Sequence, residues 1–305
     1  MGRIEKTIGI ALFFILLVLI VLLFMQNLSP NKNELVYSVS VLVDDLHEYA
    51  QMGMDKAALA YNLDVHYVSG FDRNAAQQAE SIQREIENGV NALIVSAADA
   101  EYISSYLDEA HVSIPVITLG DKLISPAVTA HIAPDQYALG YSLGARMLEA
   151  SYLYPCLVIL EQDSPAYLRE RCEGLTSAFE EGGRTIECRY VENSAEAVSA
   201  LMQDRRATCI AVVDEAMLPA LCEGSRFYDK LFGAGYDRAA RAALENGNLN
   251  TLVVYSAFDE GYTSMRYAYQ AIRSPSLSDF VLQAVVVDKT NMYLPPQEQM
   301  LFPIS

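Results

Sequence analysis

The sequence has no tryptophan and little positive charge. Of its 305 residues, 21 are Lys or Arg and 39 are Asp or Glu, which gives a formal net charge of −18 at pH 7. Such an excess of acid repels the phosphates of nucleic acids, so we expect no nucleic-acid partner. A hydrophobic share of 52% also excludes intrinsic disorder, because that many apolar residues can bury a core.

The motifs of common catalytic and metal sites are missing as well. The sequence has no P-loop, H-E-x-x-H motif or EF-hand loop, and its four histidines lack metal-ligand spacing, so we predict no metal and no cofactor. Residues 140–144 match G-x-S-x-G, the nucleophile motif of α/β-hydrolases. However, every histidine precedes Ser142, and Ser142 belongs to a predicted helix, so the hydrolase order cannot be met. We therefore predict a binding protein rather than an enzyme.

The cysteines are few and all lie in the second half of the chain, at Cys156, Cys172, Cys188, Cys209 and Cys222. None forms a C-x-x-C pair, and several lie at the edges of apolar strand-like runs, where cysteine behaves as a small hydrophobic residue. We expect mostly free thiols in the core. One disulfide is compatible with the sequence, and its pairing stays open.

One long apolar run is present, at residues 8–25, with 18 consecutive residues that carry no charge. At about 1.5 Å per residue in a helix this run reaches roughly 27 Å, close to the thickness of the bilayer core. We predict an uncleaved membrane anchor in contact with lipid. A cleaved signal peptide is the alternative. Arg3 and Lys6 precede the run, so the N-terminus is expected in the cytoplasm and everything after about residue 27 outside.

After a linker at residues 28–35, short β-rich runs alternate with amphipathic helical segments. This alternation predicts an α/β fold with parallel sheets covered by helices. The predicted strands are too many for one ordinary sheet, so two lobes of five or six strands each are favoured. The strands are expected at residues 36–43, 64–69, 92–96, 115–119, 128–132, 156–161, 185–191, 209–213, 231–236 and 252–255.

Polar residues recur directly after the predicted strands, on both halves of the chain. They are found at residues 44–45, 96–99, 120–122, 214–215 and 237–238. In open α/β sheets the ligand site lies at the carboxyl ends of the strands, so these residues are candidates for a lined cleft. A helix cap is the favoured interpretation of any one of them taken alone, but their recurrence on both halves favours a site.

Six segments in order resemble the type I periplasmic sugar-binding proteins, the family of ribose-binding protein and the lactose-repressor core. They are SVSVLVDDLHEYAQMGMDKAA (38–58), IPVITLGDK (114–122), AHIAPDQYALGYSLGARML (130–148), RERCEGLTSAF (169–179), VVDEAML (212–218) and FGAGYD (232–237). The resemblance runs from about residue 36 to the end of the chain. It implies two Rossmann-like lobes joined by a multi-strand hinge, with lobe 1 at residues 36–134 plus 256–283 and lobe 2 at residues 135–255 plus 284–305.

The resemblance also implies a ligand site between the lobes, where carboxylates and cationic groups would bind the paired hydroxyls of a sugar. Leu46 and His47 replace the family's usual sandwiching aromatic rings, Val213 replaces an Asn, and Lys122 stands where an Arg is common. The hinge glutamine of the family corresponds to Tyr255 or Ser256. The implied ligand-binding residues are Asp44, His47, Asp121, Lys122, Arg171, Asp237 and Tyr255.

Two functions follow from the resemblance and the predicted anchor. The first is a membrane-tethered, extracytoplasmic solute-binding protein that binds a small polar, carbohydrate-like ligand and delivers it to an ABC transporter permease. The second is a ligand-sensing or adaptor module for a membrane receptor or sensor histidine kinase, which the departures from the family's pocket favour. The cytoplasmic segment is short, so any signal must pass through another protein.

Overall fold

The computed structural model describes residues 16–18, 36–151, 156–162, 164–203, 209–224, 230–235, 237–274 and 276–303. The chain divides into two units, Met1–Val36 and Tyr37–Ser305, and the second unit holds the α/β fold. The predicted membrane span at residues 8–25 lies outside the described residues, apart from residues 16–18. No helix within the described ranges is long and apolar enough to cross a membrane.

The described strands form two six-stranded sheets. The first has the order β11-β5-β4-β3-β1-β2 and is parallel throughout. The second has the order β12-β10-β9-β8-β6-β7 and is parallel except for β12, which runs antiparallel to β10. The strands are β1 (Tyr37–Leu42), β2 (Leu63–Val68), β3 (Ala92–Ser96), β4 (Val116–Leu119), β5 (Val128–Pro134), β6 (Cys156–Glu161), β7 (Glu187–Val191), β8 (Cys209–Val212), β9 (Leu231–Ala234), β10 (Thr251–Tyr255), β11 (Phe280–Leu282) and β12 (Ala284–Asp288).

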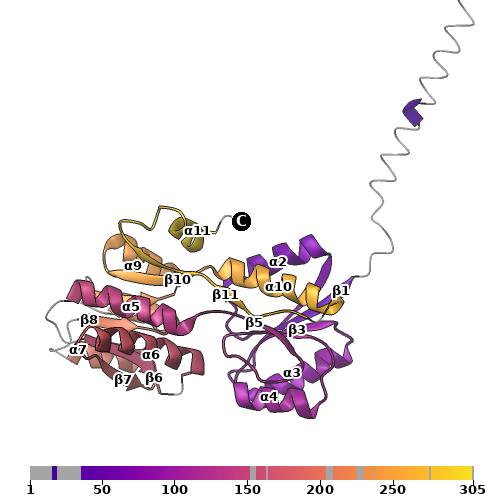
Figure 1. Ribbon diagram of the computed structural model, residues 1–305, viewed down its shortest axis with the longest axis horizontal. Helices are drawn as coiled ribbons and strands as arrows, with labels where there is room; N and C mark the ends of the chain where they lie inside the picture. The colour runs from indigo at the N-terminus through magenta and orange to yellow at the C-terminus, as the bar shows by residue number, and fades with distance from the viewer. Residues whose placement is uncertain are drawn as a thin grey trace, which may run out of the picture. The chain divides into compact units, whose positions relative to one another are not determined.

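Helices cover both faces of each sheet (Figure 1). On the first sheet, α2 (Glu48–Tyr61) and α10 (Ala257–Arg273) pack on one face, and α3 (Ala75–Glu87) and α4 (Ala100–Glu109) on the other. On the second sheet, α5 (Gln136–Ser151) and α6 (Ala166–Glu181) pack on one face. The opposite face carries α7 (Ser194–Gln203), α8 (Leu218–Gly224) and α9 (Arg238–Asn246), with α11 (Gln297–Leu301) nearby. We call these two assemblies the first and the second lobe.

The predicted α/β organisation is confirmed, and each of the ten predicted strands is found within a few residues of its expected place. The sequence does not predict β11 and β12. These two short strands are separated by Gln283 alone. The sequence between them contains no Gly, Pro, Asn or Asp that would indicate a turn. At this residue the chain passes from the first sheet to the second.

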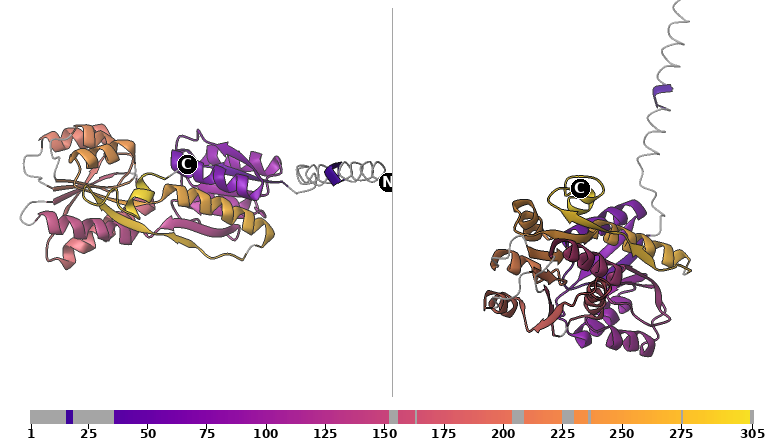
Figure 2. Two further views of the ribbon diagram at one scale, coloured as in Figure 1. Left: turned by 90° about the horizontal axis from the view of Figure 1, so that it is seen from above. Right: turned by 60° about the vertical axis from the view of Figure 1, so that its left-hand side comes forward.

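Three such passages between the sheets lie within the described chain. They fall between β5 and α5, between β10 and α10, and between β11 and β12. In Figure 2 the chain after α10, coloured yellow, runs from the first lobe back to the second. Because α5 and α10 each begin directly after a passage, each lobe contains a helix that enters from the other lobe.

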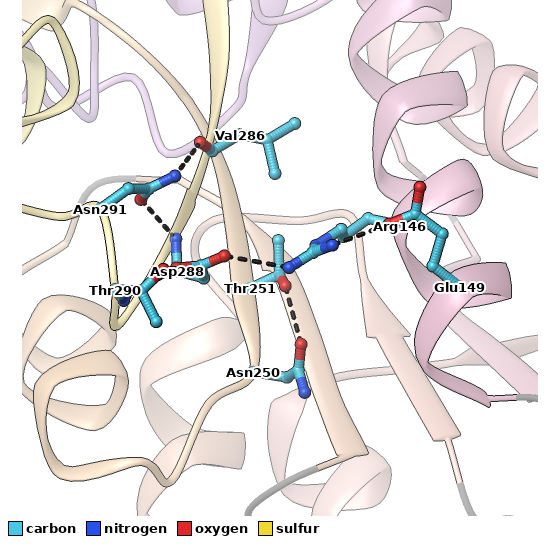
Figure 3. Close-up of polar contacts among 8 residues, drawn as sticks. All are labelled: Arg146, Glu149, Asn250, Thr251, Val286, Asp288, Thr290 and Asn291. Atoms are coloured by element: carbon cyan, nitrogen blue, oxygen red, sulfur yellow. Dashed lines mark hydrogen bonds and ion pairs between the residues drawn. The ribbon is translucent and has the colours of Figure 1, made fainter.

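Asp288, at the end of β12, ties the last passage to α5 (Figure 3). Its Oδ2 accepts a hydrogen bond from Arg146 Nη2 at 3.0 Å, and Arg146 also pairs with Glu149 at 2.7 Å. Its Oδ1 accepts from the backbone N–H of Thr290 at 2.8 Å, and its own N–H donates to Asn291 Oδ1 at 2.8 Å. Burial alone would raise the pKa of Asp288, but the Thr290 hydrogen bonds and the Arg146 charge outweigh it and lower the pKa.

The G-x-S-x-G motif is a helix-packing motif in this protein. A Cβ on Gly140 of α5 would lie 1.7 Å from the Arg171 carbonyl oxygen, and one on Gly174 of α6 would lie 2.0 Å from the Tyr137 carbonyl oxygen. The glycines therefore let α5 and α6 pack backbone against backbone. Ser142 lies within α5 and donates a hydrogen bond to the Ala138 carbonyl at 2.8 Å. The prediction that this serine belongs to a helix is confirmed.

Candidate functional site

Two adjoining cavities lie at the carboxyl ends of the strands. The Arg73 cavity has a volume of ≈190 Å³ and is lined by Val43, Asp44, Asp45, Arg73, Gln78, Ser96, Ala97, Ala98, Asp121, Pro165 and Tyr167. The Tyr255 cavity has a volume of ≈150 Å³ and is lined by Val43, Asp45, Leu46, His47, Ala50, Ser96, Leu119, Gly120, Ala133, Pro134, Gln136, Tyr167, Glu215, Tyr255 and Glu260. Four residues line both, and the linings draw on both lobes. Among the described residues, no group of three or more His, Cys, Asp or Glu side chains is placed to hold a metal ion.

Asp44, the first predicted ligand residue, lines the Arg73 cavity and also organises its wall. Its Oδ1 accepts hydrogen bonds from the backbone N–H groups of Gly70 and Phe71, both at 2.8 Å. Its Oδ2 accepts from the backbone N–H of Arg73 at 3.2 Å. The carboxylate is thus committed to holding the loop between β2 and α3, which brings the Arg73 side chain to the cavity.

Asp121 connects the two lobes. Its Oδ1 accepts from the Tyr167 N–H at 2.7 Å and its Oδ2 from the Ala166 N–H at 3.1 Å. These are the first amides of α6, whose own N-cap residue, Pro165, supplies no side-chain acceptor. A carboxylate from the first lobe therefore caps a helix of the second lobe and complements the positive end of its dipole. An Arg73 to Glu161 ion pair at 3.6 Å lies beside this connection.

Lys122 and Asp237 line neither cavity. The Lys122 ammonium is exposed and pairs with Asp279 Oδ2 at 2.5 Å, on the segment that leads to β11. Asp237 is the N-cap of α9 and accepts from the Ala239 N–H at 2.6 Å. Local partners thus hold both charges outside the cavity linings. Burial lowers the pKa of His47, and the nearby Asp237 charge acts on it in the opposite direction.

Arg171 is fully buried, with 0% of its surface exposed, and lies behind the Tyr255 cavity. Its Nε and Nη2 donate to Gln136 Oε1 at 3.0 and 2.7 Å, and its Nη1 donates to the Val213 carbonyl at 2.7 Å. The guanidinium also pairs with Glu215 Oε1, the shorter distance being 3.3 Å. Arg171 thus holds two residues that line the cavity, Gln136 and Glu215, and does not line it itself.

His47 and Tyr255 do line the Tyr255 cavity. His47 is the N-cap of α2, and its Nδ1 accepts from the Tyr49 N–H at 3.2 Å. Burial lowers the pKa of His47, so its ring is neutral at neutral pH, as an accepting Nδ1 requires. Tyr255 ends β10 and is buried, with 8% of its surface exposed. The cavity therefore combines a neutral imidazole with an aromatic side chain.

Six further polar residues line the Tyr255 cavity that were not among the implied ligand residues: Asp45, Ser96, Gln136, Tyr167, Glu215 and Glu260. Asp45 and Ser96 belong to the strand-end groups noted in the sequence. Glu215 directly follows Asp214 at the end of a strand, so its position after a predicted strand marked it as a candidate in the sequence. Gln136 is the first residue of α5, next to the expected cap Asp135. Glu260 lies in the first turn of α10, where the alternation of strands and helices gives no signal.

The carboxyl groups of Glu215 and Glu260 both have raised pKa values. Burial raises the pKa of Glu260 to about 8, and the nearby Glu215 charge adds to this. Burial and the Asp214 charge also raise the pKa of Glu215, while Arg171 acts in the opposite direction. Within the described part of the chain, no hydrogen bond or ion pair reaches the Glu260 side chain. The cavity thus holds an acid that keeps its proton near neutral pH.

This raised pKa predicts a pH-dependent stability. The folded protein keeps the Glu260 proton up to about pH 8, whereas the ordinary pKa is 4.5, so stability falls as the pH rises through this window, by at most about 1.4 kcal/mol per pH unit. We expect Glu260→Gln to lose this slope and to exceed the wild type in stability above about pH 8. Urea unfolding of both proteins from about pH 5 to about pH 9 measures the difference; parallel profiles would contradict the prediction. The other titratable groups of this cavity are Asp45, His47, Tyr167, Glu215 and Tyr255.

Comparison with known proteins gives the family. The sequence profile described as "Periplasmic binding protein domain" matches residues 35–275. The chain belongs to this family. The resemblance to type I periplasmic sugar-binding proteins is thereby confirmed, and the family accounts for the two-lobed α/β fold. No curated protein was found to match the chain.

Solved structures of the family's fold cover nearly the whole second unit. A carbohydrate transporter solute-binding protein from Agrobacterium radiobacter, in complex with D-arabinose, is 16% identical over 87% of this chain and 99% of its own, with a TM-score of 0.79. A solute-binding protein from Agrobacterium vitis bound with α-D-tagatopyranose is 15% identical over the same shares, with a TM-score of 0.78. A glucose-galactose binding protein from Geobacillus stearothermophilus is 17% identical over 86% and 100%, with a TM-score of 0.76. These similarities show a shared fold.

Proposed function

We propose that this chain is an extracytoplasmic solute-binding protein that holds a small, polyhydroxylated ligand in the two adjoining cavities. The observation that carries the proposal is the convergence of side-chain donors and acceptors from both lobes on one space, namely Asp45, Ser96, Gln136, Tyr167 and Glu215. Adjacent hydroxyl groups of a sugar donate to carboxylates and accept from amides and hydroxyls. Several solved structures with this fold hold sugars, which supports the same ligand class.

The lining favours a neutral or cationic ligand over an anionic one. Among the described residues, no Lys or Arg lines the Tyr255 cavity, whereas the carboxylates of Asp45 and Glu215 do. Glu260 keeps its proton near neutral pH and adds no charge there. In the Arg73 cavity, the Arg73 guanidinium already pairs with Glu161 and faces three carboxylates. A buried anion would therefore lack a free cationic partner, which is costly. Neutral sugars and amino sugars fit this lining.

We propose that the lobes, residues 36–134 plus 256–283 and residues 135–255 plus 284–305, close on the ligand about the three passages between the sheets. Such hinge closure places the ligand against groups from both lobes at once. Asp44 and Asp121 would then serve the site as positioning residues, since their carboxylates already hold the β2–α3 loop and the start of α6. His47 and Tyr255 would contact the ligand.

Thermal unfolding of the full chain in detergent tests the proposal with four probes: D-arabinose, D-galactose, D-glucosamine and D-glucuronate. A ligand at 100 times its Kd adds about 2.7 kcal/mol to the stability of the folded state, which is a shift of several degrees in Tm. We expect one of the neutral or amino sugars to raise Tm and the anionic glucuronate to leave it unchanged. A shift with glucuronate alone would contradict the charge argument, and no shift with any probe would argue against the binding function.

A matched pair of variants locates the site. We expect Glu215→Gln to weaken binding of the stabilising sugar by roughly tenfold or more, because an acceptor at the cavity loses its charge. We expect Lys122→Ala to leave the Kd unchanged, because its ammonium pairs with Asp279 outside the cavities. Isothermal titration calorimetry measures both. Equal losses in the two variants would place the ligand elsewhere.

We further propose that residues 8–25 anchor the protein in the membrane, with the N-terminus in the cytoplasm, and that the bound ligand passes to an ABC transporter permease. The membership in the periplasmic binding protein domain family supports an extracytoplasmic binding domain. Carbonate extraction should leave the chain in the membrane pellet, and protease added to intact cells should cleave the binding domain. Release of the chain by carbonate would argue against the anchor.

Sensing is a second candidate function, with a sensor histidine kinase as partner. It is favoured by the hydrogen bonds from the start of α6 to Asp121, which connect the lobes without a ligand group between them. Chemical crosslinking in native membranes distinguishes the two partners. Crosslinks to a transporter permease would support uptake, and crosslinks to a kinase would support sensing.

A further inference from the structure

Two cysteines from different elements of the second lobe lie in contact. Cys172 of α6 and Cys188 of β7 have their Sγ atoms 3.8 Å apart. Cys172 is buried, with 7% of its surface exposed, whereas Cys188 is exposed. β7 is the last strand of the sheet on this side and pairs with β6. The pair therefore connects a core helix to an edge strand, with one sulfur open to solvent.

The contact requires little movement to become a bond. A disulfide brings the two sulfurs to about 2.05 Å, so the gap to close is smaller than 2 Å. Cys188 lies on the edge strand β7, so a small backbone shift of this strand disturbs its pairing with β6 only. Rotation of the two cysteine side chains closes the remaining distance between the sulfurs. The sequence analysis left one disulfide open, and in this pair the two sulfurs are already in contact.

The two thiols also differ in reactivity. The hydrogen bond from Cys172 lowers the pKa of Cys188 to about 6, and Thr176, whose Oγ1 lies 3.9 Å from Cys188 Sγ, acts in the same direction. The same hydrogen bond and burial raise the pKa of Cys172. Since thiolates are the nucleophiles in exchange, Cys188 is the residue that meets an oxidant, and Cys172 can be reached only through it.

We propose that Cys172 and Cys188 form a disulfide by exchange with an external disulfide, either an oxidised dithiol protein or a small-molecule disulfide. The Cys188 thiolate attacks one sulfur of the oxidant, forms a mixed disulfide and releases the first thiolate. Cys172 then gives its proton to solvent, attacks Cys188 Sγ and expels the second thiolate. The two cysteines are oxidised with loss of two protons and two electrons, and the oxidant is reduced to two thiols.

The bond would join α6 to β7 next to the binding site. Cys172 directly follows Arg171, whose guanidinium holds Gln136 and Glu215 at the Tyr255 cavity. The disulfide closes a chain segment of moderate length, which restricts the unfolded state. This inference does not depend on the identity of the ligand.

A second cysteine pair provides an internal control. Cys156 and Cys209 lie opposite each other in the register of β6 and β8. Both are buried, with 4% and 2% of their surfaces exposed. Neither offers an oxidant an exposed sulfur, so exchange chemistry should select Cys172 and Cys188.

The test treats the full chain in detergent with oxidised glutathione, removes the glutathione, unfolds the protein in denaturant, blocks the remaining thiols with iodoacetamide and maps the peptides by mass spectrometry. We expect a linked peptide pair containing Cys172 and Cys188, alkylation of the other three cysteines, and a Tm higher by roughly 5 °C or more than that of the reduced protein. Cys188→Ser should abolish the linked peptides and the Tm gain. Cys209→Ser should keep both.

Three outcomes would overturn the proposal. These are alkylation of all five cysteines after oxidation, a Cys156 to Cys209 link in place of the expected one, and glutathione retained on Cys188 because Cys172 does not attack. Cys188→Ser replaces an exposed residue at a sheet edge and should fold as the wild type does. Cys172→Ala is the second variant, and it should trap glutathione on Cys188.

Discussion

Gly174→Ala is expected to destabilise the protein by roughly 3 kcal/mol or more. The new Cβ would lie 2.0 Å from the Tyr137 carbonyl oxygen and 3.0 Å from the Tyr141 backbone nitrogen. Both are backbone atoms, so no side-chain rotation relieves the clash, and α5 and α6 must move apart. Helix propensity alone would make the same change stabilising by about 1 kcal/mol, so the sign of the effect tests the packing directly. Urea unfolding at equilibrium measures it.

Ser142→Ala is the matched control. Ser142 lies on α5, in the middle of the G-x-S-x-G motif. Its hydroxyl donates a hydrogen bond to the Ala138 carbonyl of the same helix. We expect a stability within about 0.5 kcal/mol of the wild type. If Gly174→Ala proved as stable as Ser142→Ala, the close approach of α5 and α6 would be wrong.

Arg171→Met is expected to cost about 3–5 kcal/mol and to weaken binding of the stabilising sugar by roughly tenfold or more. Methionine fills much of the same volume but supplies no donor. Glu215 then loses its ionic partner, and the acceptors on Gln136 and Val213 lose theirs. Because Glu215 and Gln136 line the Tyr255 cavity, the loss of their anchor also changes the site. Chemical unfolding and calorimetric titration report the two effects.

Arg169→Ala separates a general helix effect from the loss of the buried charge. Arg169 is exposed and lies two residues earlier on α6, so its replacement should change stability by less than about 0.5 kcal/mol. Adding Glu215→Leu to Arg171→Met should restore part of the stability, because it removes the unpaired carboxylate, but should not restore binding. A double variant less stable than Arg171→Met would refute the ion-pair explanation.

The fold was largely predictable from the sequence because its signals are local. Apolar runs such as those of β3 and β6 are bounded by turn residues and separated by amphipathic segments, so their spacing alone indicates parallel sheets under helices. The missed strands β11 and β12 had no such boundary. Their assignment depends on Gln283 crossing between two sheets, which is a property of the tertiary structure.

The site was less predictable, because a carboxylate after a strand has two uses that look alike in sequence. Asp44 and Asp121 both face the Arg73 cavity, yet their oxygens accept from backbone amides at 2.7 to 3.2 Å. Such a carboxylate can bind a ligand or accept hydrogen bonds from backbone amides. The second use prevails where a loop or the start of a helix from elsewhere in the chain lies within hydrogen-bond distance of the carboxylate. Glu260 is the opposite case, because nothing in the sequence marks it as a site residue, yet it lines the Tyr255 cavity. It does so because α10 returns to the first lobe.

The glycine contacts between helices bear on the order in which the chain folds. In the second lobe, Gly140 and Gly174 join α5 to α6, which are neighbours in sequence. In the first lobe, Gly53 and Gly261 make the equivalent contacts between α2 and α10, with Cβ positions 2.1 Å from the Phe258 carbonyl oxygen and 1.9 Å from that of Ala50. Contacts between distant segments form late, because a long loop must close first. The first lobe begins to be synthesised first, yet it cannot be completed before α10 and β11 have been made. Its apolar α2 face therefore stays open until α10 has left the ribosome.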